Sequence, residues 1–174
     1  MKLTRLAAFD QLFFTLLFQR FGSSTVAPLC RYCSRTADGP YYALLALLLW
    51  WWQVAGASDF ILLLAMAYAI ELPSYMLLKN LFRRQRPAQL WQGTFQSHIQ
   101  PSDRFSLPSG HTAGAFVMLG VIALLYPFWL ILVLPWAVAV GLSRILLGVH
   151  FPGDVCAGAM LGLLSVLAAQ AVLA

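Results

Sequence analysis

The sequence predicts an all-α integral membrane protein with about five transmembrane helices and an N-terminal amphipathic helix that lies in the membrane interface. Of its 174 residues, 61% are hydrophobic and 10% are charged, whereas a soluble domain carries about 25% charged residues. The mean hydropathy is +0.78, and several uncharged stretches approach the roughly 20 residues that a membrane-spanning helix needs. This composition excludes a soluble globule, a disordered tail and a soluble nucleic-acid-binding protein. The bilayer is therefore an expected partner and nucleic acid is not.

Five apolar segments are predicted to span the membrane. They cover residues 41–57, 60–79, the two halves of 112–143, and 152–174. The stretch 112–143 is too long for one span and is broken near Tyr126 and Pro127. In the last span, Gly158 and Gly162 are four residues apart, which favours close packing against a neighbouring helix.

The N-terminal part of the chain differs from these spans. Residues 3–21 carry Arg5, Asp10 and Arg20, and their polar side chains recur at spacings of four and seven residues. This periodicity is typical of an amphipathic helix lying in the interface. We therefore divide the chain into an amphipathic segment, residues 1–37, and a transmembrane domain, residues 38–174.

Two polar stretches, residues 22–40 and 80–110, are predicted to be loops. The first contains Cys30 and Cys33 in a CxxC arrangement. Without a second pair of Cys or His, a zinc site lacks half of its ligands. A redox role and two ordinary thiols both remain open for these cysteines.

Tracing the five spans places most polar chemistry on one side of the membrane. The residues gathered there are Lys79, Arg83, Arg84, Arg86, Asp103, Arg104, Ser109, His111, Arg144, His150 and Asp154. Two acids in the loops cannot neutralise six cations. A multiply charged anion such as phosphate is therefore the expected ligand.

Two helix starts in this group favour the same ligand. Ser109 and Gly110 precede an apolar run, where free backbone N–H groups and the positive end of a helix dipole favour an anion. Asp154 follows His150 by one helical turn. A carboxylate that holds one imidazole nitrogen as N–H leaves the other nitrogen as a nucleophile or base.

These residues fall into three motifs. Residues 79–87 fit KxxxxxxRP, residues 108–111 read PSGH, and residues 143–154 fit SRxxxxxHxxxD. In this order and spacing the chain resembles the type 2 phosphatidic acid phosphatase superfamily, over roughly residues 38 to 173. The resemblance implies the helical core that these phosphatases share with vanadium haloperoxidases.

The resemblance also implies roles for individual residues. His150 would attack phosphorus and form a phosphohistidine, with Asp154 orienting it, and His111 would protonate the leaving oxygen. The residues implied to bind the phosphoryl oxygens are Lys79, Arg86, Ser109, Gly110 and Arg144. No metal and no cofactor is expected. Arg83 and Arg84 lie outside the motifs, and we expect them as accessory ligands for a second phosphate.

The expected function is hydrolysis of a lipid phosphate, with undecaprenyl diphosphate as the first candidate substrate. Phosphatidylglycerophosphate or phosphatidate is the alternative substrate, and a non-catalytic lipid-phosphate binder or transporter is the alternative class. The resemblance places the protein in a bacterial cytoplasmic membrane with its site on the periplasmic face. The positive-inside rule opposes that orientation, because the basic residues cluster on the side of the site. The sequence does not indicate an oligomeric state.

Overall fold

The computed structural model describes residues 2–93, 95–101 and 103–174, and within these ranges it contains helices and no strand. The helices are α1 (Lys2–Phe21), α2 (Ala27–Arg35), α3 (Gly39–Trp51), α4 (Ala57–Phe82), α5 (Pro87–Leu90), α6 (Gly110–Leu125), α7 (Leu130–Leu146) and α8 (Pro152–Leu173). A 3-10 turn, Pro127–Trp129, separates α6 from α7, which confirms the predicted break near Tyr126 and Pro127.

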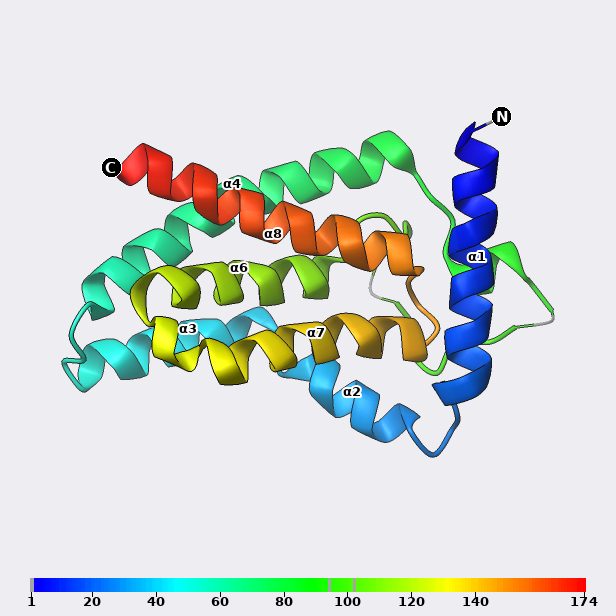
Figure 1. Cartoon of the computed structure of the whole chain (residues 1–174), viewed down its shortest axis with the longest axis horizontal. Helices are drawn as coiled ribbons and strands as arrows, with labels where there is room; N and C mark the ends of the chain where they lie inside the picture. Colours follow the sequence, from blue (N-terminus) through cyan, green and yellow to red (C-terminus); the bar gives the residue numbers. More distant parts are fainter. Residues whose placement is uncertain (1, 94, 102) are drawn as a thin grey trace.

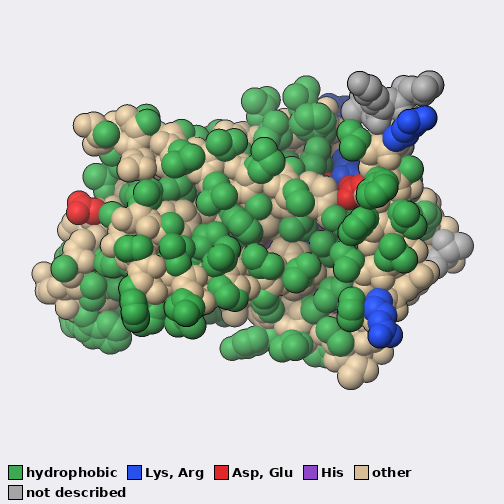
Figure 2. Space-filling view, viewed as in Figure 1, with side chains coloured by type: hydrophobic (Ala, Val, Ile, Leu, Met, Phe, Trp, Pro, Cys, Tyr) green, Lys and Arg blue, Asp and Glu red, His purple; other side chains and the backbone are tan. Residues whose placement is uncertain are grey.

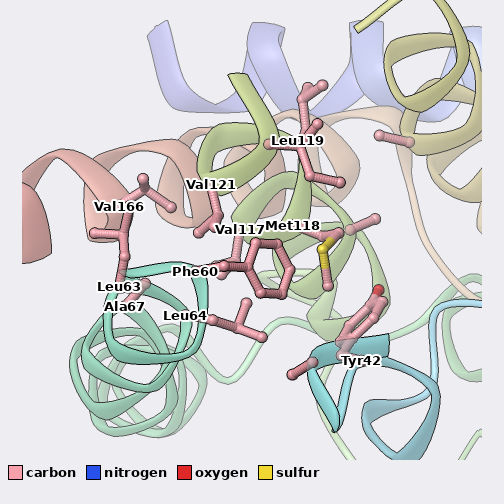
Figure 3. Packing of buried hydrophobic residues seen from close by; sticks show 14 of the residues in the cluster. Tyr42, Phe60, Leu63, Leu64, Ala67, Val117, Met118, Leu119, Val121 and Val166 are labelled. Carbon is pink, nitrogen blue, oxygen red and sulfur yellow. The ribbon is translucent and has the colours of Figure 1, made fainter. Parts of the chain in front are cut away.

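Helix α6 forms the centre of the bundle and packs against α4, α7 and α8 (Figure 1). Its residues 112–115 and 117–122 are all buried. In the core between these helices, Phe60 of α4 lies among Val117 and Val121 of α6 (Figure 3). Because α6 is enclosed by other helices, its 16 residues are covered mainly by protein.

Helix α8 approaches α6 closely through two glycines. A Cβ atom at Gly158 would lie 2.5 Å from the carbonyl oxygen of Ser109, and one at Gly162 would overlap the carbonyl oxygen of Ala113. The prediction that Gly158 and Gly162 mediate close packing is therefore confirmed. This contact also fixes the start of α8 beside the start of α6.

The surface along the bundle is apolar, as expected for an integral membrane protein. Figure 2 shows hydrophobic side chains along its length, with Lys and Arg at the end that α1 crosses. Among the described residues, three helical stretches are long and apolar enough to cross a membrane: Ala57–Leu90, Pro127–Leu146 and Pro152–Leu173. Helices α3 and α6 are shorter, so the predicted number of five spans is not confirmed.

Helix α1 runs across the end of the bundle rather than alongside it (Figure 1). Phe14 anchors it, being 1% exposed and packed against Phe151 and Trp91. Other large apolar side chains of α1, including Phe9 and Phe13, remain exposed. This arrangement suits a helix with one face on the protein and another toward lipid.

Two sequence-based boundaries are wrong. Residues 22–40 are not all loop, because α2 occupies Ala27–Arg35 with its buried face formed by Ala27, Cys30 and Ser34. These small residues gave little hydrophobic signal. The first predicted span ends early, at Trp51, because the chain then turns through left-handed conformations at Gln53 and Gly56.

Candidate functional site

All eight residues predicted to act in catalysis or phosphate binding meet at the end of the bundle that α1 crosses. They come from the end of α4 and the connection after it, the start of α6, the end of α7 and the start of α8. Hydrogen bonds join some of them, and one cavity of about 260 Å³ is lined by others, including Gly110, His111, Arg144 and His150. The structure therefore brings together side chains separated by up to 75 positions, from Lys79 to Asp154.

His150 is 2% exposed, in the short connection between α7 and α8. Its Nε2 atom lies 3.3 Å from Nη1 of Arg86. Because a guanidinium only donates hydrogen bonds, Nε2 is the acceptor and the ring proton sits on Nδ1. Burial, together with the charges of Arg86 and Arg144, lowers the pKa of His150 to about 4. At neutral pH the imidazole is uncharged, and its unprotonated Nε2 accepts a long hydrogen bond from Arg86.

The other side of the His150 ring faces Asp154. Its Nδ1 atom lies 3.7 Å from Oδ2 of Asp154, which is longer than a hydrogen bond, and it has no hydrogen-bond partner in the described part of the chain. Asp154 is fully buried and accepts hydrogen bonds from the Phe151 backbone N–H at 2.8 Å, the Ser106 hydroxyl and Arg84. These donors fix the Asp154 carboxylate in place, and a small movement of the His150 ring would bring Nδ1 within hydrogen-bond distance of it.

Lys79 and Arg86 converge on a single carboxylate, that of Asp103. The Lys79 ammonium lies 2.7 Å from Oδ2 of Asp103, and Nη2 of Arg86 lies 2.6 Å from Oδ1. Tyr75 donates a further hydrogen bond to Oδ2 at 3.0 Å. Burial opposes ionisation of Asp103, but the hydrogen bonds from Lys79 and Arg86 outweigh it and lower the pKa of this carboxyl to about 2. An anion with two oxygens is therefore already bound between two predicted phosphate ligands.

The start of α6 presents backbone N–H groups to the same region. Ser109 is the residue that precedes the helix, and its hydroxyl accepts a hydrogen bond from Thr112 at 2.9 Å. The Ser109 N–H is held by the Asp154 carbonyl at 3.0 Å. At Gly110 an added Cβ would press on the Tyr75 ring at 3.0 Å. Glycine thus lets the helix start pack against α4.

His111 and Arg144 each have a partner in the N-terminal part of the chain. Nε2 of His111 lies 3.1 Å from Oδ1 of Asp38, and Nη1 of Arg144 donates to the Ser34 hydroxyl at 2.7 Å. Arg144 is 5% exposed, and its Nε has no hydrogen-bond partner among the described residues. The buried guanidinium thus keeps a donor available for a ligand.

The two accessory candidates lie apart from the cavity. Arg83 is exposed at the end of α4 and donates through Nε to the Asn80 carbonyl at 3.0 Å. Arg84 forms ion pairs with Asp154 at 2.8 Å and with Asp10 of α1 at 2.5 Å. The charge of Arg84 is therefore occupied by two carboxylates, and this placement does not fit the predicted role as a ligand for a second phosphate.

Sequence reasoning missed four partners of the site: Asp10, Ser34, Asp38 and Ser106. Three of them precede residue 39, outside the part of the chain that carries the motifs. Asp10 was noted only as part of a polar stripe, although it also accepts a hydrogen bond from the Gly153 N–H at 2.7 Å. Among the four, Asp38 could have been singled out from the sequence, because an acid immediately before the Gly39–Pro40 start of an apolar helix lies at the membrane surface, where the site is.

The CxxC cysteines show no metal site. Cys30 and Cys33 are free thiols, and burial raises the pKa of both. Across the described ranges, no three His, Cys, Asp or Glu side chains gather closely enough to hold a metal ion. The structure thus gives the two cysteines a packing role on α2, where Cys30 lies in a small apolar cluster with Leu147 and Val149.

A family model described as the PAP2 superfamily matches residues 56–173 of this chain. The match covers more than half of the chain and includes all three motifs. A decaprenylphosphoryl-5-phosphoribose phosphatase of Mycobacterium tuberculosis is 40% identical over 113 residues, which are 63% of this chain and 54% of that protein. The chain therefore spans about half the length of this curated relative.

Two solved structures share the fold. LpxE of Aquifex aeolicus superposes with a TM-score of 0.79 at 23% identity, covering 92% of this chain and 94% of that one. A transmembrane PAP2-type phosphatidylglycerolphosphate phosphatase of Bacillus subtilis gives a TM-score of 0.73 at 21% identity, covering 97% and 86% respectively. These coverages extend the likeness to the N-terminal helices, beyond the span of the family match.

Proposed function

The chain belongs to the PAP2 superfamily, and from this membership and the geometry of its site we propose that it is a membrane lipid phosphatase that works through a phosphohistidine at His150. One observation carries the proposal. The unprotonated Nε2 of His150 faces Arg86, which with Lys79 already holds a carboxylate in the manner expected of a phosphate.

The first step is binding of the phosphoryl group. Its oxygens take the place of the Asp103 carboxylate between Lys79 and Arg86, and the free Nε of Arg144 donates to it as well. The Gly110 N–H and the Ser109 hydroxyl complete the site at the positive end of the α6 dipole. These donors stabilise the charge that develops on the equatorial oxygens in the transition state.

Transfer to the enzyme follows. Nε2 of His150 attacks phosphorus, the bond from phosphorus to the leaving oxygen breaks, and His111 gives that oxygen a proton. The resulting positively charged ring moves toward Asp154, 3.7 Å away in the free enzyme, so that its Nδ1–H donates a hydrogen bond to the carboxylate and keeps its proton. In the free enzyme, burial and the charge of Arg144 lower the pKa of His111 to about 4, against the attraction of Asp38 at 3.1 Å. The negative charge of the bound phosphoryl group favours the protonated form, so we propose that His111 takes up its proton when the substrate binds.

Hydrolysis returns the enzyme to its starting state. His111, now neutral, takes a proton from a water molecule that attacks phosphorus, and the bond between phosphorus and Nε2 breaks. Inorganic phosphate leaves and Asp103 pairs again with Lys79 and Arg86. The three cations supply the charge stabilisation that a metal ion gives other phosphatases, so we propose a metal-independent reaction.

We propose a polyprenyl lipid as the substrate, with undecaprenyl diphosphate as the first candidate. The name of the Mycobacterium tuberculosis relative, which specifies a decaprenyl carrier, supports a polyprenyl chain. Phosphatidylglycerophosphate and phosphatidate are the substrates to compare with it. The rate of phosphate release from each of these three lipids, measured in the same detergent, makes the comparison.

The test of the reaction is to trap the intermediate. Brief incubation with substrate labelled in the terminal phosphate should leave label on the wild-type protein that is stable to base and labile to acid. His150→Ala should lose this label and at least about a hundredfold of the rate. Gln170→Ala is the control, because it changes an exposed residue near the C-terminal end of α8 that does not line the cavity containing His150. Binding of the lipid without phosphate release would instead indicate a non-catalytic binder.

We propose that the protein resides in a bacterial cytoplasmic membrane with its site on the periplasmic face. Because α1 lies across the same end as the site (Figure 1), its basic residues add to those near the motifs, and the positive-inside rule still opposes this orientation. Labelling an Ala174→Cys variant that lacks the three native cysteines decides between the two orientations. A periplasmic site requires the C-terminus, at the opposite end of α8, to react only with a membrane-permeant thiol reagent.

A further inference from the structure

A second cavity, of about 460 Å³, adjoins the site on the side of His111. It lies between α2, the segment containing His98 and the end of α7. It shares Asp38, His111 and Arg144 with the cavity that contains His150. A group attached to the leaving oxygen, which the proposed reaction places at His111, therefore has direct access to it.

Two arginines outside the three motifs line this cavity. Arg31 and Arg35 are four residues apart on α2, so both side chains lie on the same face of that helix. Both are exposed. Two like charges at this spacing repel each other. An anion bound between the two guanidinium groups would remove this repulsion.

The protein itself does not supply that anion. In the described ranges, no carboxylate lies within ion-pair distance of either arginine. Arg31 donates only to the His98 carbonyl, at 2.9 Å. The one acid in the cavity lining, Asp38, is paired with His111. Arg144, which is 5% exposed, adds a third guanidinium whose Nε has no hydrogen-bond partner.

We propose that this cavity is a subsite for a second phosphoryl group, carried on the leaving part of the substrate. Arg31 and Arg35 bind it, and Arg144, which lines both cavities, lies between it and the scissile phosphate. The proposal rests on the proposed lipid phosphatase function and specifies its substrate class: a lipid diphosphate or a lipid with a phosphodiester beside the scissile phosphate. In this proposal, arginines of α2 bind the second phosphate, the role expected from the sequence for Arg83 and Arg84.

The surroundings of the cavity also provide for the lipid chain. Thr36, the residue after Arg35, lines a separate apolar cavity of about 340 Å³ between α3 and α7, which also contains Tyr41 and Trp136. Because Thr36 adjoins Arg35 in the chain, we infer that a hydrocarbon chain attached to a phosphate at Arg35 runs toward this cavity. The alternative route, beside Glu71 in the cavity that contains His150, would bring a second phosphate next to an acid.

The test compares two substrates that share one chain, farnesyl diphosphate and farnesyl monophosphate, in non-ionic detergent without phospholipid. Arg31→Ala/Arg35→Ala should lower kcat/KM for the diphosphate by about tenfold or more, because two charge-assisted hydrogen bonds are lost. The value for the monophosphate should change by less than about threefold. Arg5→Ala/Arg20→Ala is the control, because it removes two exposed arginines from α1 outside the cavity.

Two further measurements keep the test decisive. Arg31 also donates to the His98 carbonyl, so its loss could act through that segment. Arg35→Ala alone avoids this effect and should also lower kcat/KM for the diphosphate selectively. Equilibrium binding to the His150→Ala protein shows whether the arginine variant loses affinity for the diphosphate but not for the monophosphate. This arm tests the subsite even if wild-type protein releases no phosphate, the result that would reject only the proposed function.

Three outcomes would overturn the subsite: equal losses for both substrates, no loss for either, or a loss that appears only in vesicles containing anionic phospholipid. The last would assign Arg31 and Arg35 to bilayer headgroups instead of the substrate. Arg31→Lys/Arg35→Lys should recover part of the diphosphate activity, because it retains the charge while losing the guanidinium geometry.

Discussion

Asp103 is bound to Arg86 by an ion pair of 2.6 Å, and the same carboxylate pairs with Lys79 at 2.7 Å. An acid from the loop before α6 thus lies between two cations of the proposed phosphate site. Its side chain is 35% exposed, whereas those of Lys79 and Arg86 are almost completely buried. The carboxylate is therefore the accessible partner, and phosphate must compete with it for the two buried cations.

Asp103→Asn should strengthen phosphate binding. The amide keeps the size of the side chain but removes the charge that competes for Lys79 and Arg86. A partly exposed ion pair contributes about 1 kcal/mol or less, and Asp103 makes two of them, so the inhibition constant of inorganic phosphate should fall by up to about 25-fold. Product-inhibition kinetics at pH 7.5 measure it.

The control for this variant is Asp59→Asn, which removes an exposed acid from the first turn of α4 at the opposite end of that helix. An unchanged or weaker inhibition by phosphate in Asp103→Asn would contradict competition. It would indicate that Asp103 mainly orients Arg86.

Arg84 should act as a positioning residue for Asp154. It joins Asp154 to Asp10 of α1, and Asp10 also accepts the Gly153 N–H. Arg84→Ala should lower kcat by about ten- to a hundredfold, the range expected for a lost charge-assisted hydrogen bond, with KM nearly unchanged. Arg84→Lys should recover part of the rate.

A double-mutant cycle with Asp10→Ala tests whether α1 contributes through this pair. The combined variant should be less impaired than the product of the single effects, because both changes remove the same connection. Arg83→Ala should behave like wild type, since among the described residues its exposed side chain bonds only to the Asn80 carbonyl. A parallel rise in KM for Arg84→Ala would instead indicate direct binding of substrate.

The titration of His150 is expected far below the usual range for histidine. Burial and the charges of Arg86 and Arg144 lower its pKa to about 4, compared with about 6.5 in an unfolded chain. NMR of protein labelled at the side chains of its three histidines should show His150 neutral down to about pH 4, with assignment by His98→Gln and His111→Gln. A midpoint near 6.5 for His150 would refute this electrostatic environment.

The same shift has a consequence for stability. As the pH falls from about 6.5 to 4, the unfolded chain takes up a proton that folded His150 does not accept. The free energy of unfolding should therefore decrease across this interval, which denaturation in detergent at several pH values measures. His150→Gln should remove this part of the pH dependence.

The sequence singled out motif residues that the structure brings together, but it did not identify several of their partners, for a physical reason. The motif residues occupy helix ends, and their order and spacing follow from where helices start and stop. The contacts of Arg84 with Asp10 and of Arg144 with Ser34 join positions 74 and 110 residues apart. No periodicity encodes such pairs. Helix α2 escaped prediction because its buried face is made of small residues.

The close contact between α8 and α6 should be intolerant of a single added methyl group. In Gly162→Ala the new Cβ would overlap the Ala113 carbonyl oxygen and approach the Val117 backbone nitrogen at 2.9 Å. Both neighbours are backbone atoms and cannot rotate away, so α8 must shift. Overpacking of this kind destabilises proteins by about 1–3 kcal/mol, which unfolding in detergent should detect. Because the first turn of α8 contains Asp154, whose carbonyl accepts a hydrogen bond from the Ser109 N–H at 3.0 Å, phosphate release should also decrease. Gly39→Ala is the matched control, since its Cβ meets nothing within 4 Å, and equal stability of the two variants would show that the contact is not tight.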